Sequence, residues 1–85
     1  MGYFFRKQFK KQYSKLPPKI QTQFDDRFKI FLNDETHPLL NVHQLRGGRE
    51  GQYTFNVNAD YRVVFSRDRE VVIFHEIGTH SELYQ

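Results

Sequence analysis

Three short apolar runs decide the fold of this chain: Tyr53-Thr54-Phe55-Asn56-Val57, Tyr61-Arg62-Val63-Val64-Phe65 and Val71-Val72-Ile73-Phe74. Each run is rich in Val, Ile, Tyr and Phe, which favour strands. Turn-forming residues separate the runs at positions 58–60 and 66–69. The pattern predicts an antiparallel meander. A short polar tail, residues 77–84, follows it.

Alternation along these runs gives the predicted sheet two faces. The face expected to meet helices carries Tyr53, Phe55, Val57, Tyr61, Val63 and Phe65. The opposite face carries Thr54, Asn56, Arg62, Val64 and Ser66. The run at 71–74 is apolar on both sides, so we expect it to be a central strand.

Upstream of the sheet, the apolar period becomes that of a helix. One stripe consists of Phe5, Phe9, Tyr13 and Leu16, and it stops at Pro17-Pro18. A second helix is expected over residues 19–33, and Pro18 suits its first turn. Its stripe consists of Ile20, Phe24, Phe28, Phe31 and Leu32. Residues 2–5 fit a short edge strand, although four residues decide little.

These elements predict an α+β fold in which a two-helix hairpin packs on one face of a small antiparallel sheet. The length of 85 residues predicts one domain, 1–85. Nine Phe and five Tyr supply most of its core. The chain has no cysteine, which excludes disulfides and thiolate zinc sites. Neither a membrane-spanning stretch nor a signal-peptide pattern is visible, so we expect a soluble cytoplasmic protein.

The net charge is +3, and the basic residues gather near the start of the chain. Residues 1–40 hold eight Lys and Arg against four Asp and Glu. Six bases precede the first acid: Arg6, Lys7, Lys10, Lys11, Lys15 and Lys19. Such a basic end suits phosphate or an acidic partner, and it also suits the solvated face of a helix.

The tail contains a helix-start signal. Thr79 followed by Glu82 is a capping-box pattern, which predicts a helical turn beginning at His80. His80 and Tyr84 then share one face of that turn. Two interpretations remain open. One is a terminal turn that only packs Leu83 and Tyr84 on the sheet, and the other is a paired imidazole and phenol at the rim of a cleft.

Other polar residues near the meander are candidates for chemistry. Arg62 interrupts an apolar strand, and its guanidinium suits a phosphate, although an ion pair with Asp60 or Glu76 would account for it equally well. His43, Arg46 and Arg49 lie beside a glycine-rich segment. His75, Glu76 and His80 do not match a metal-ligand spacing, so we expect neither a metal nor another cofactor.

Histidine, arginine and tyrosine together suit metal-free cleavage of RNA, in which the 2′-hydroxyl is the nucleophile. Histidine titrates near neutrality and serves as general acid or base. Arginine stabilises the charge that grows on the phosphate oxygens. Tyrosine stacks a base or donates a proton. The composition permits this reaction without demonstrating it.

Four segments resemble the RelE/ParE superfamily of type II toxins, and the RelE/StbE or YafQ-like branch in particular. They are Phe-Lys-Lys-Gln-Tyr at 9–13, His-Pro-Leu-Leu-Asn-Val-His at 37–43, Asp-Tyr-Arg at 60–62 and Ile-Gly-Thr-His-Ser-Glu-Leu-Tyr at 77–84. The resemblance implies a ribosome-dependent mRNA endoribonuclease held inactive by a cognate antitoxin. The free toxin would be a monomer that binds mRNA and ribosomal RNA.

The resemblance also implies the site residues: His43, Asp60, Arg62, His80 and Tyr84 as catalytic, and Arg46, Arg49, Lys7, Lys10 and Lys11 as RNA-binding. His80 and His43 would transfer protons, Arg62 would bind the phosphate and Asp60 would be an orienting residue of the site. A second YafQ-like histidine is replaced by Asn56. Two alternatives stay open: a ParE-like toxin that inhibits DNA gyrase by binding, and an inactive homologue that only binds protein.

Overall fold

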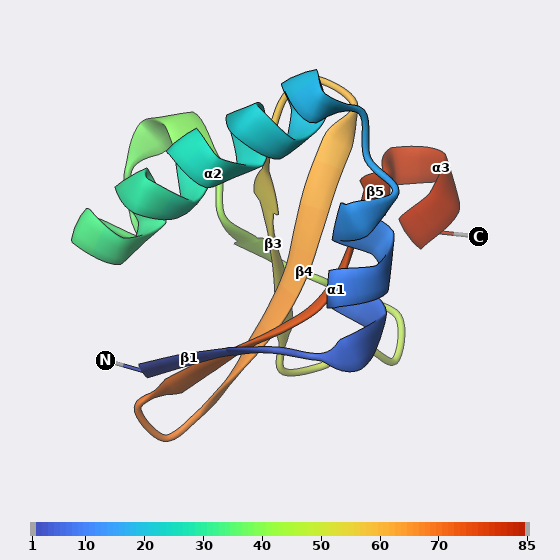
Figure 1. Ribbon diagram of the computed structural model, residues 1–85. Helices are drawn as coiled ribbons and strands as arrows, with labels where there is room; N and C mark the ends of the chain where they lie inside the picture. Colours follow the sequence, from blue (N-terminus) through green and yellow to red (C-terminus); the bar gives the residue numbers. More distant parts are fainter. Residues whose placement is uncertain (1, 85) are drawn as a thin grey trace.

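The computed structural model describes residues 2–84 and has the predicted α+β architecture (Figure 1). A five-stranded sheet has the order β1-β5-β4-β3-β2. The strands are β1 (Gly2–Phe5), β2 (His43–Gln44), β3 (Gln52–Asn56), β4 (Tyr61–Asp68) and β5 (Val71–Thr79). The helices are α1 (Lys7–Ser14), α2 (Pro18–Asn33), the 3-10 turn η1 (Pro38–Leu40) and α3 (His80–Leu83).

The sheet is mixed, whereas the sequence predicts an antiparallel one. Strand β1 pairs in parallel with β5, from Gly2 opposite Val71 to Phe5 opposite Phe74. The other three pairings are antiparallel. A four-residue strand carries no signal for its partner or its direction, which explains the difference. The position of β5 between two neighbours agrees with its apolar character on both faces.

The hairpin between β4 and β5 extends further than predicted. Residues 66–68, which the sequence assigns to a turn, continue β4, and the turn lies at Arg69 and Glu70. Arg69 adopts a left-handed backbone conformation with φ of 59°. Because the turn needs only two residues, the polar residues before it remain free to pair with β5.

The main core lies between the sheet and helices α1 and α2. Phe55, Val63 and Phe65 are fully buried on this face, as the alternation predicts, and Phe74 of β5 is buried beside them. The helices contribute Phe9, Phe24 and Phe31. Phe5 ends β1 rather than starting a helix, yet its ring stacks on Phe9 with a centroid distance of 5.1 Å.

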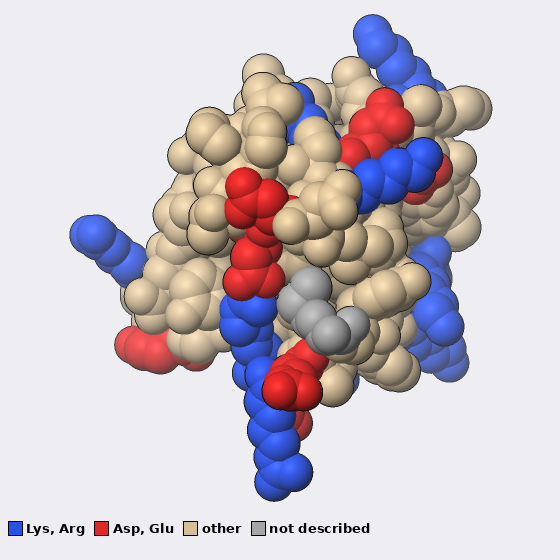
Figure 2. Space-filling model, turned by 90° about the vertical axis from the view of Figure 1, so that its left-hand side faces the viewer, with Lys and Arg blue, Asp and Glu red and all other residues tan. Residues whose placement is uncertain are grey.

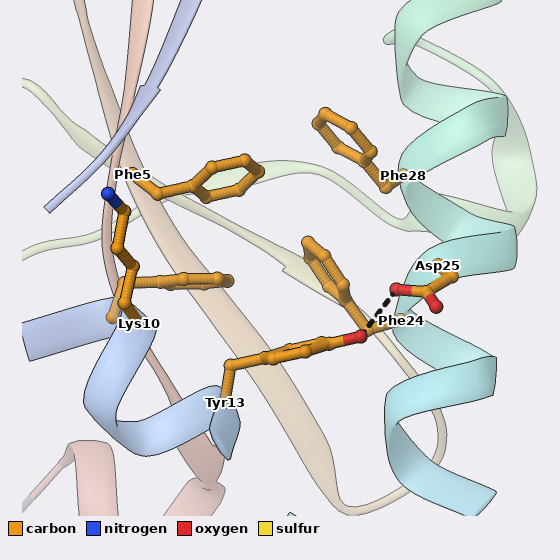
Figure 3. Close-up of a pocket in the computed structure, with 7 residues that line it drawn as sticks. Phe5, Lys10, Tyr13, Phe24, Asp25 and Phe28 are labelled. Atoms are coloured by element: carbon orange, nitrogen blue, oxygen red, sulfur yellow. Dashed lines mark hydrogen bonds between the residues drawn. The ribbon is translucent and has the colours of Figure 1, made fainter. Parts of the chain in front are cut away.

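Helices α1 and α2 diverge from the short connection between them (Figure 1). Aromatic side chains from both helices line a hollow in the space between them (Figure 3). The hollow has a volume of about 320 Å³ and is lined by Phe5, Phe9, Lys10, Tyr13, Phe24, Asp25 and Phe28. Figure 3 shows the Tyr13 hydroxyl reaching across from α1 to Asp25 on α2, where it donates a hydrogen bond of 2.9 Å. The predicted hairpin is therefore a V whose arms are joined through side chains.

The opposite face of the sheet is partly covered by α3. Val64 is fully buried there and packs with Leu45 and Leu83, which are mostly buried, and Tyr84 packs against this second cluster. Thr54 on the same face is also fully buried. The face predicted to be polar thus holds a small core of its own, because α3 folds back across it.

Charged residues of both signs are interspersed on the face that Figure 2 shows, where several Lys and Arg side chains project from the rim. That face therefore presents no continuous field of one sign. Among residues 2–84, no helix combines the length and the apolarity needed to span a membrane.

Candidate functional site

Helix α3 is fixed at its start by three hydrogen bonds. The Thr79 hydroxyl accepts from the Glu82 N–H at 3.2 Å, and the Glu82 carboxylate accepts from the Thr79 N–H at 2.7 Å, which confirms the predicted capping box. The His80 N–H donates to the carbonyl of Asp60 at 3.1 Å. The loop before β4 therefore sets where α3 begins.

His80 and Tyr84 lie one helical turn apart, with their rings in contact. The ring centroids are 4.4 Å apart at an interplanar angle of 64°, an edge-to-face arrangement. The imidazole is exposed, whereas Tyr84 is half-buried against the Leu83 and Val64 cluster. The phenol ring thus supports the imidazole from the protein side.

A groove of about 670 Å³ opens in front of this pair. It is lined by His43, Gln44, Leu45, Arg46, Arg62, His80 and Tyr84. These residues come from β2, the loop after it, β4 and α3. Four of the five residues proposed as catalytic, all except Asp60, therefore meet in one concave surface.

His43 stands at the β2 side of the groove, opposite Thr54 in the ladder. Its Nδ1 lies 3.0 Å from the carbonyl oxygen of Asn41. A carbonyl only accepts, so Nδ1 carries the proton in this arrangement. The Nε2 atom, 3.4 Å from the Thr54 hydroxyl, is then the basic nitrogen.

Arg62 projects from the centre of the sheet, where it pairs with Asn56 on one side and Gly78 on the other. Its Nε donates to the Asn56 side-chain oxygen at 3.4 Å. Among the described residues, no carboxylate forms an ion pair with Arg62. The alternative pairing with Asp60 or Glu76 is therefore not found, and the groove keeps a cationic floor.

The two other arginines near the groove differ. Arg46 is exposed and lines the groove. Arg49 is partly buried and bonded to Glu76, Gln52 and the Leu83 carbonyl.

Asp60 does not line the groove. Its carbonyl oxygen, rather than its carboxylate, accepts the hydrogen bond from the His80 N–H of α3. The α1 lysines also lie elsewhere, with Lys7 and Lys11 beside a shallow hollow on α1 and Lys10 at the aromatic hollow.

No three metal-binding side chains gather anywhere in residues 2–84. His75 is instead engaged with the Ser66 hydroxyl at 2.7 Å. Burial lowers the pKa of His75 below its usual range, and the positive charge of Arg6 adds to this effect.

The sequence did not indicate that Thr54 and Gln44 lie beside the groove, since a threonine in an apolar strand gives no signal of its own.

A model of a bacterial toxin family of type II toxin-antitoxin systems, YafQ, matches residues 1–85. The chain belongs to the YafQ family. This confirms the resemblance to type II toxins and selects the YafQ-like branch. No curated protein matches the chain in sequence.

Solved structures share the fold of this YafQ family member at low identity. YafQ from E. coli strain BL21(DE3) is 20% identical, with 98% of this chain and 97% of that chain covered and a TM-score of 0.78. The E. coli DinJ-YafQ toxin-antitoxin complex gives 21% identity, coverage of 98% and 96%, and a TM-score of 0.74. A YoeB/ParE toxin from Agrobacterium tumefaciens is 14% identical, with 94% of this chain and 99% of that chain covered and a TM-score of 0.76. Since YafQ and YoeB/ParE toxins fit almost equally well, the fold does not separate one activity from another.

Proposed function

We propose that this toxin is a metal-independent endoribonuclease that cleaves translated mRNA at the ribosome. The observation that supports it is the groove, in which His43, Arg62 and the His80–Tyr84 pair meet from three separate parts of the sequence. A toxin that acts only by binding has no need for two imidazoles and a guanidinium around one cavity.

The reaction needs a base, an acid and a cation. The base removes the proton of the 2′-hydroxyl, whose oxygen attacks the adjacent phosphorus. The bond from phosphorus to the 5′-oxygen breaks, the acid protonates that oxygen, and a 2′,3′-cyclic phosphate remains. Proton transfer of this kind contributes about 10²–10⁴-fold to the rate.

The hydrogen bonds and ring contacts support one assignment of roles. His43 is the base, since its Nδ1–H is directed to the Asn41 carbonyl and its Nε2 accepts the proton. His80 is the acid, held in place by contact with Tyr84, whose ring also offers a surface for base stacking. Arg62 stabilises the charge on the phosphate oxygens. Asp60 positions His80 through its carbonyl oxygen.

Contacts with RNA phosphates would add binding free energy that does not depend on the RNA sequence. Arg46 extends the cationic lining of the groove, and Lys7, Lys10 and Lys11 on α1 offer charge to ribosomal RNA phosphates. Binding through such contacts weakens as the salt concentration rises.

The partner that inhibits the toxin would be a cognate antitoxin, as in the DinJ-YafQ complex. An acidic and apolar segment that folds on binding suits the cationic groove.

The test is brief induction in bacteria followed by mapping of new 5′ ends on messages. We expect cuts inside reading frames with the wild type and few cuts with His80→Ala or His43→Ala. His37→Asn is the matched control, because His37 lies outside the groove and its cap on η1 is one that asparagine also makes. Growth arrest with intact messages and raised DNA-damage signalling would instead support the gyrase-inhibiting alternative.

A further inference from the structure

Arg49 is not among the residues that line the groove, and its side chain donates three hydrogen bonds. Its Nε donates to the Gln52 side-chain oxygen at 2.9 Å, Nη1 to the Leu83 carbonyl at 3.2 Å and Nη2 to the Glu76 carboxylate at 3.3 Å. The side chains of Arg49 and Glu76 are each 29% exposed. The planar fork of arginine suits several fixed acceptors at once. Arg49 therefore joins the loop before β3 to β5 and to the end of α3.

Glu76 is shared by two parts of the fold. It faces Val64 across the β4–β5 ladder, on the side of the sheet that α3 covers. While one carboxylate oxygen accepts from Arg49, the other accepts from the Gln8 side chain of α1 at 3.4 Å. The chain of contacts thus runs from α1 through Glu76 and Arg49 to α3.

Helix α3 needs such external support. It has only four residues, and helices this short are not stable by themselves in water. Its start is fixed by the capping box, but its last carbonyls have no partner within the helix. Arg49 supplies a donor to one of them, the carbonyl of Leu83, directly before Tyr84. Arginine near a helix end commonly satisfies such carbonyls.

We propose that Arg49 and Glu76 are positioning residues for RNA cleavage, which act by holding α3 so that His80 and Tyr84 face the groove. This inference rests on the proposed ribonuclease function. It differs from a direct RNA contact by Arg49, because the guanidinium is already engaged with a carboxylate and two further oxygens. Arg46 and Arg62, which line the groove, are the arginines left to meet phosphate.

Cleavage of a defined message on purified ribosomes separates the two roles. With Arg49→Ala or Glu76→Gln, we expect the rate at saturating ribosomes to fall about tenfold, roughly the loss of one charge-assisted hydrogen bond. The ribosome concentration at half-maximal rate should stay unchanged. Arg49→Lys should recover only part of the rate, since an ammonium lacks the fork. The double variant should lose no more than Arg49→Ala alone, because Glu76 acts on α3 through Arg49.

A direct RNA contact predicts the reverse pattern and would overturn the proposal. Arg49→Ala would then raise the half-maximal concentration and reduce the salt slope by about one. Glu76→Gln would leave the rate unchanged or increase it, since it frees the guanidinium. Arg67→Ala is the control: it also breaks an arginine–glutamate pair, with Glu35 at 2.7 Å, but near the far end of β4. Its rate should match the wild type.

A second measurement keeps this inference separate from the ribonuclease proposal. Because the His80 and Tyr84 ring centroids are 4.4 Å apart, the ring current of Tyr84 should shift the His80 ring protons in the NMR spectrum. We expect Arg49→Ala to move these signals towards the values of a mobile histidine while the core methyl signals keep their positions. If the wild type cuts no message, the ribonuclease proposal fails and this spectrum alone decides whether Arg49 positions α3. Unchanged His80 signals would refute that role.

Discussion

Replacement of Leu83 by alanine should undock α3 while the rest of the fold remains intact. Leu83 is 7% exposed and is the only buried residue of this helix. It packs with Leu45 and Val64 in a cluster apart from the main core. The apolar attachment of α3 therefore depends mostly on one side chain.

The expected cost follows from the small size of that cluster. Removal of a leucine side chain from a core costs about 2–5 kcal/mol, and the lower part of this range, about 2–3 kcal/mol, applies to a site near the surface. Since 1.4 kcal/mol corresponds to a factor of ten, the ratio of docked to undocked α3 should fall roughly 30- to 140-fold. His80 and Tyr84 then leave the groove for a larger part of the time.

Amide hydrogen exchange measures this directly. The His80 N–H bonds to Asp60 and the Tyr84 N–H bonds to His80, so both amides report on docking. In Leu83→Ala they should exchange faster by the factor above, while amides of β4 stay protected. The control is Leu40→Ala, because Leu40 is fully buried in the main core. It should lower the global unfolding midpoint and leave local exchange in α3 unchanged.

Two results would refute the reasoning. Unchanged exchange at His80 and Tyr84 in Leu83→Ala would mean that the capping box and Arg49 hold α3 without its apolar anchor. A uniform rise across β4 would mean that both clusters unfold as one cooperative unit. Either way, the placement of His80 would not depend on the Leu83 contact as a separate local event.

Three further predictions concern other sites. A Cβ at Gly78 would lie 3.0 Å from the Glu82 carboxylate oxygen, so Gly78→Ala should weaken the cap of α3 by about 0.5–1 kcal/mol. The Thr79 amide, which donates to this carboxylate, should then exchange its hydrogen faster, and an unaltered rate would contradict the prediction. Burial lowers the pKa of His75 in the folded protein, so as pH falls the unfolded chain binds a proton at this histidine before the folded protein does. The free energy of unfolding should therefore decrease below pH about 6.5, and the decrease should be smaller in His75→Gln. A His75 pKa at or above 6.5, measured by NMR, would contradict the effect of burial. Tyr13→Phe removes the hydrogen bond to Asp25 and should cost about 0.5–1 kcal/mol in urea unfolding, whereas a cost above about 2 kcal/mol would show that this contact holds the two helices together.

The periodic elements of the fold could be predicted from the sequence because each repeats its signal several times. The stripes of α1 and α2 and the alternation in β3 and β4 are of this kind. The parallel pairing of β1 could not be predicted, since it depends on a partner 69 positions away and on only four residues. The end of β4 at Asp68 differs from the prediction, because polar residues suit a turn and an exposed strand equally well.

The candidate site divides in the same way. The pairing of His80 with Tyr84 follows from a capping signal and a spacing of four, both local features. The approach of His43 and Arg62 depends on the sheet register, and from the sequence only the family resemblance suggested it. The engagement of Arg49 with Glu76 and Leu83 had no sequence signal, because a loop arginine reaches partners that only the tertiary structure brings near.

The parallel pairing of β1 with β5 has a consequence for the order of folding. Gly2 and Val71 meet only after almost the whole chain is available, so this contact has a high loop-closure cost. The antiparallel pairs of β3, β4 and β5 are local by comparison and should form earlier. Until β1 docks, the outer edge of β5 stays open to other strands, a state prone to intermolecular pairing. A strand that precedes the meander in the sequence therefore joins the sheet after it.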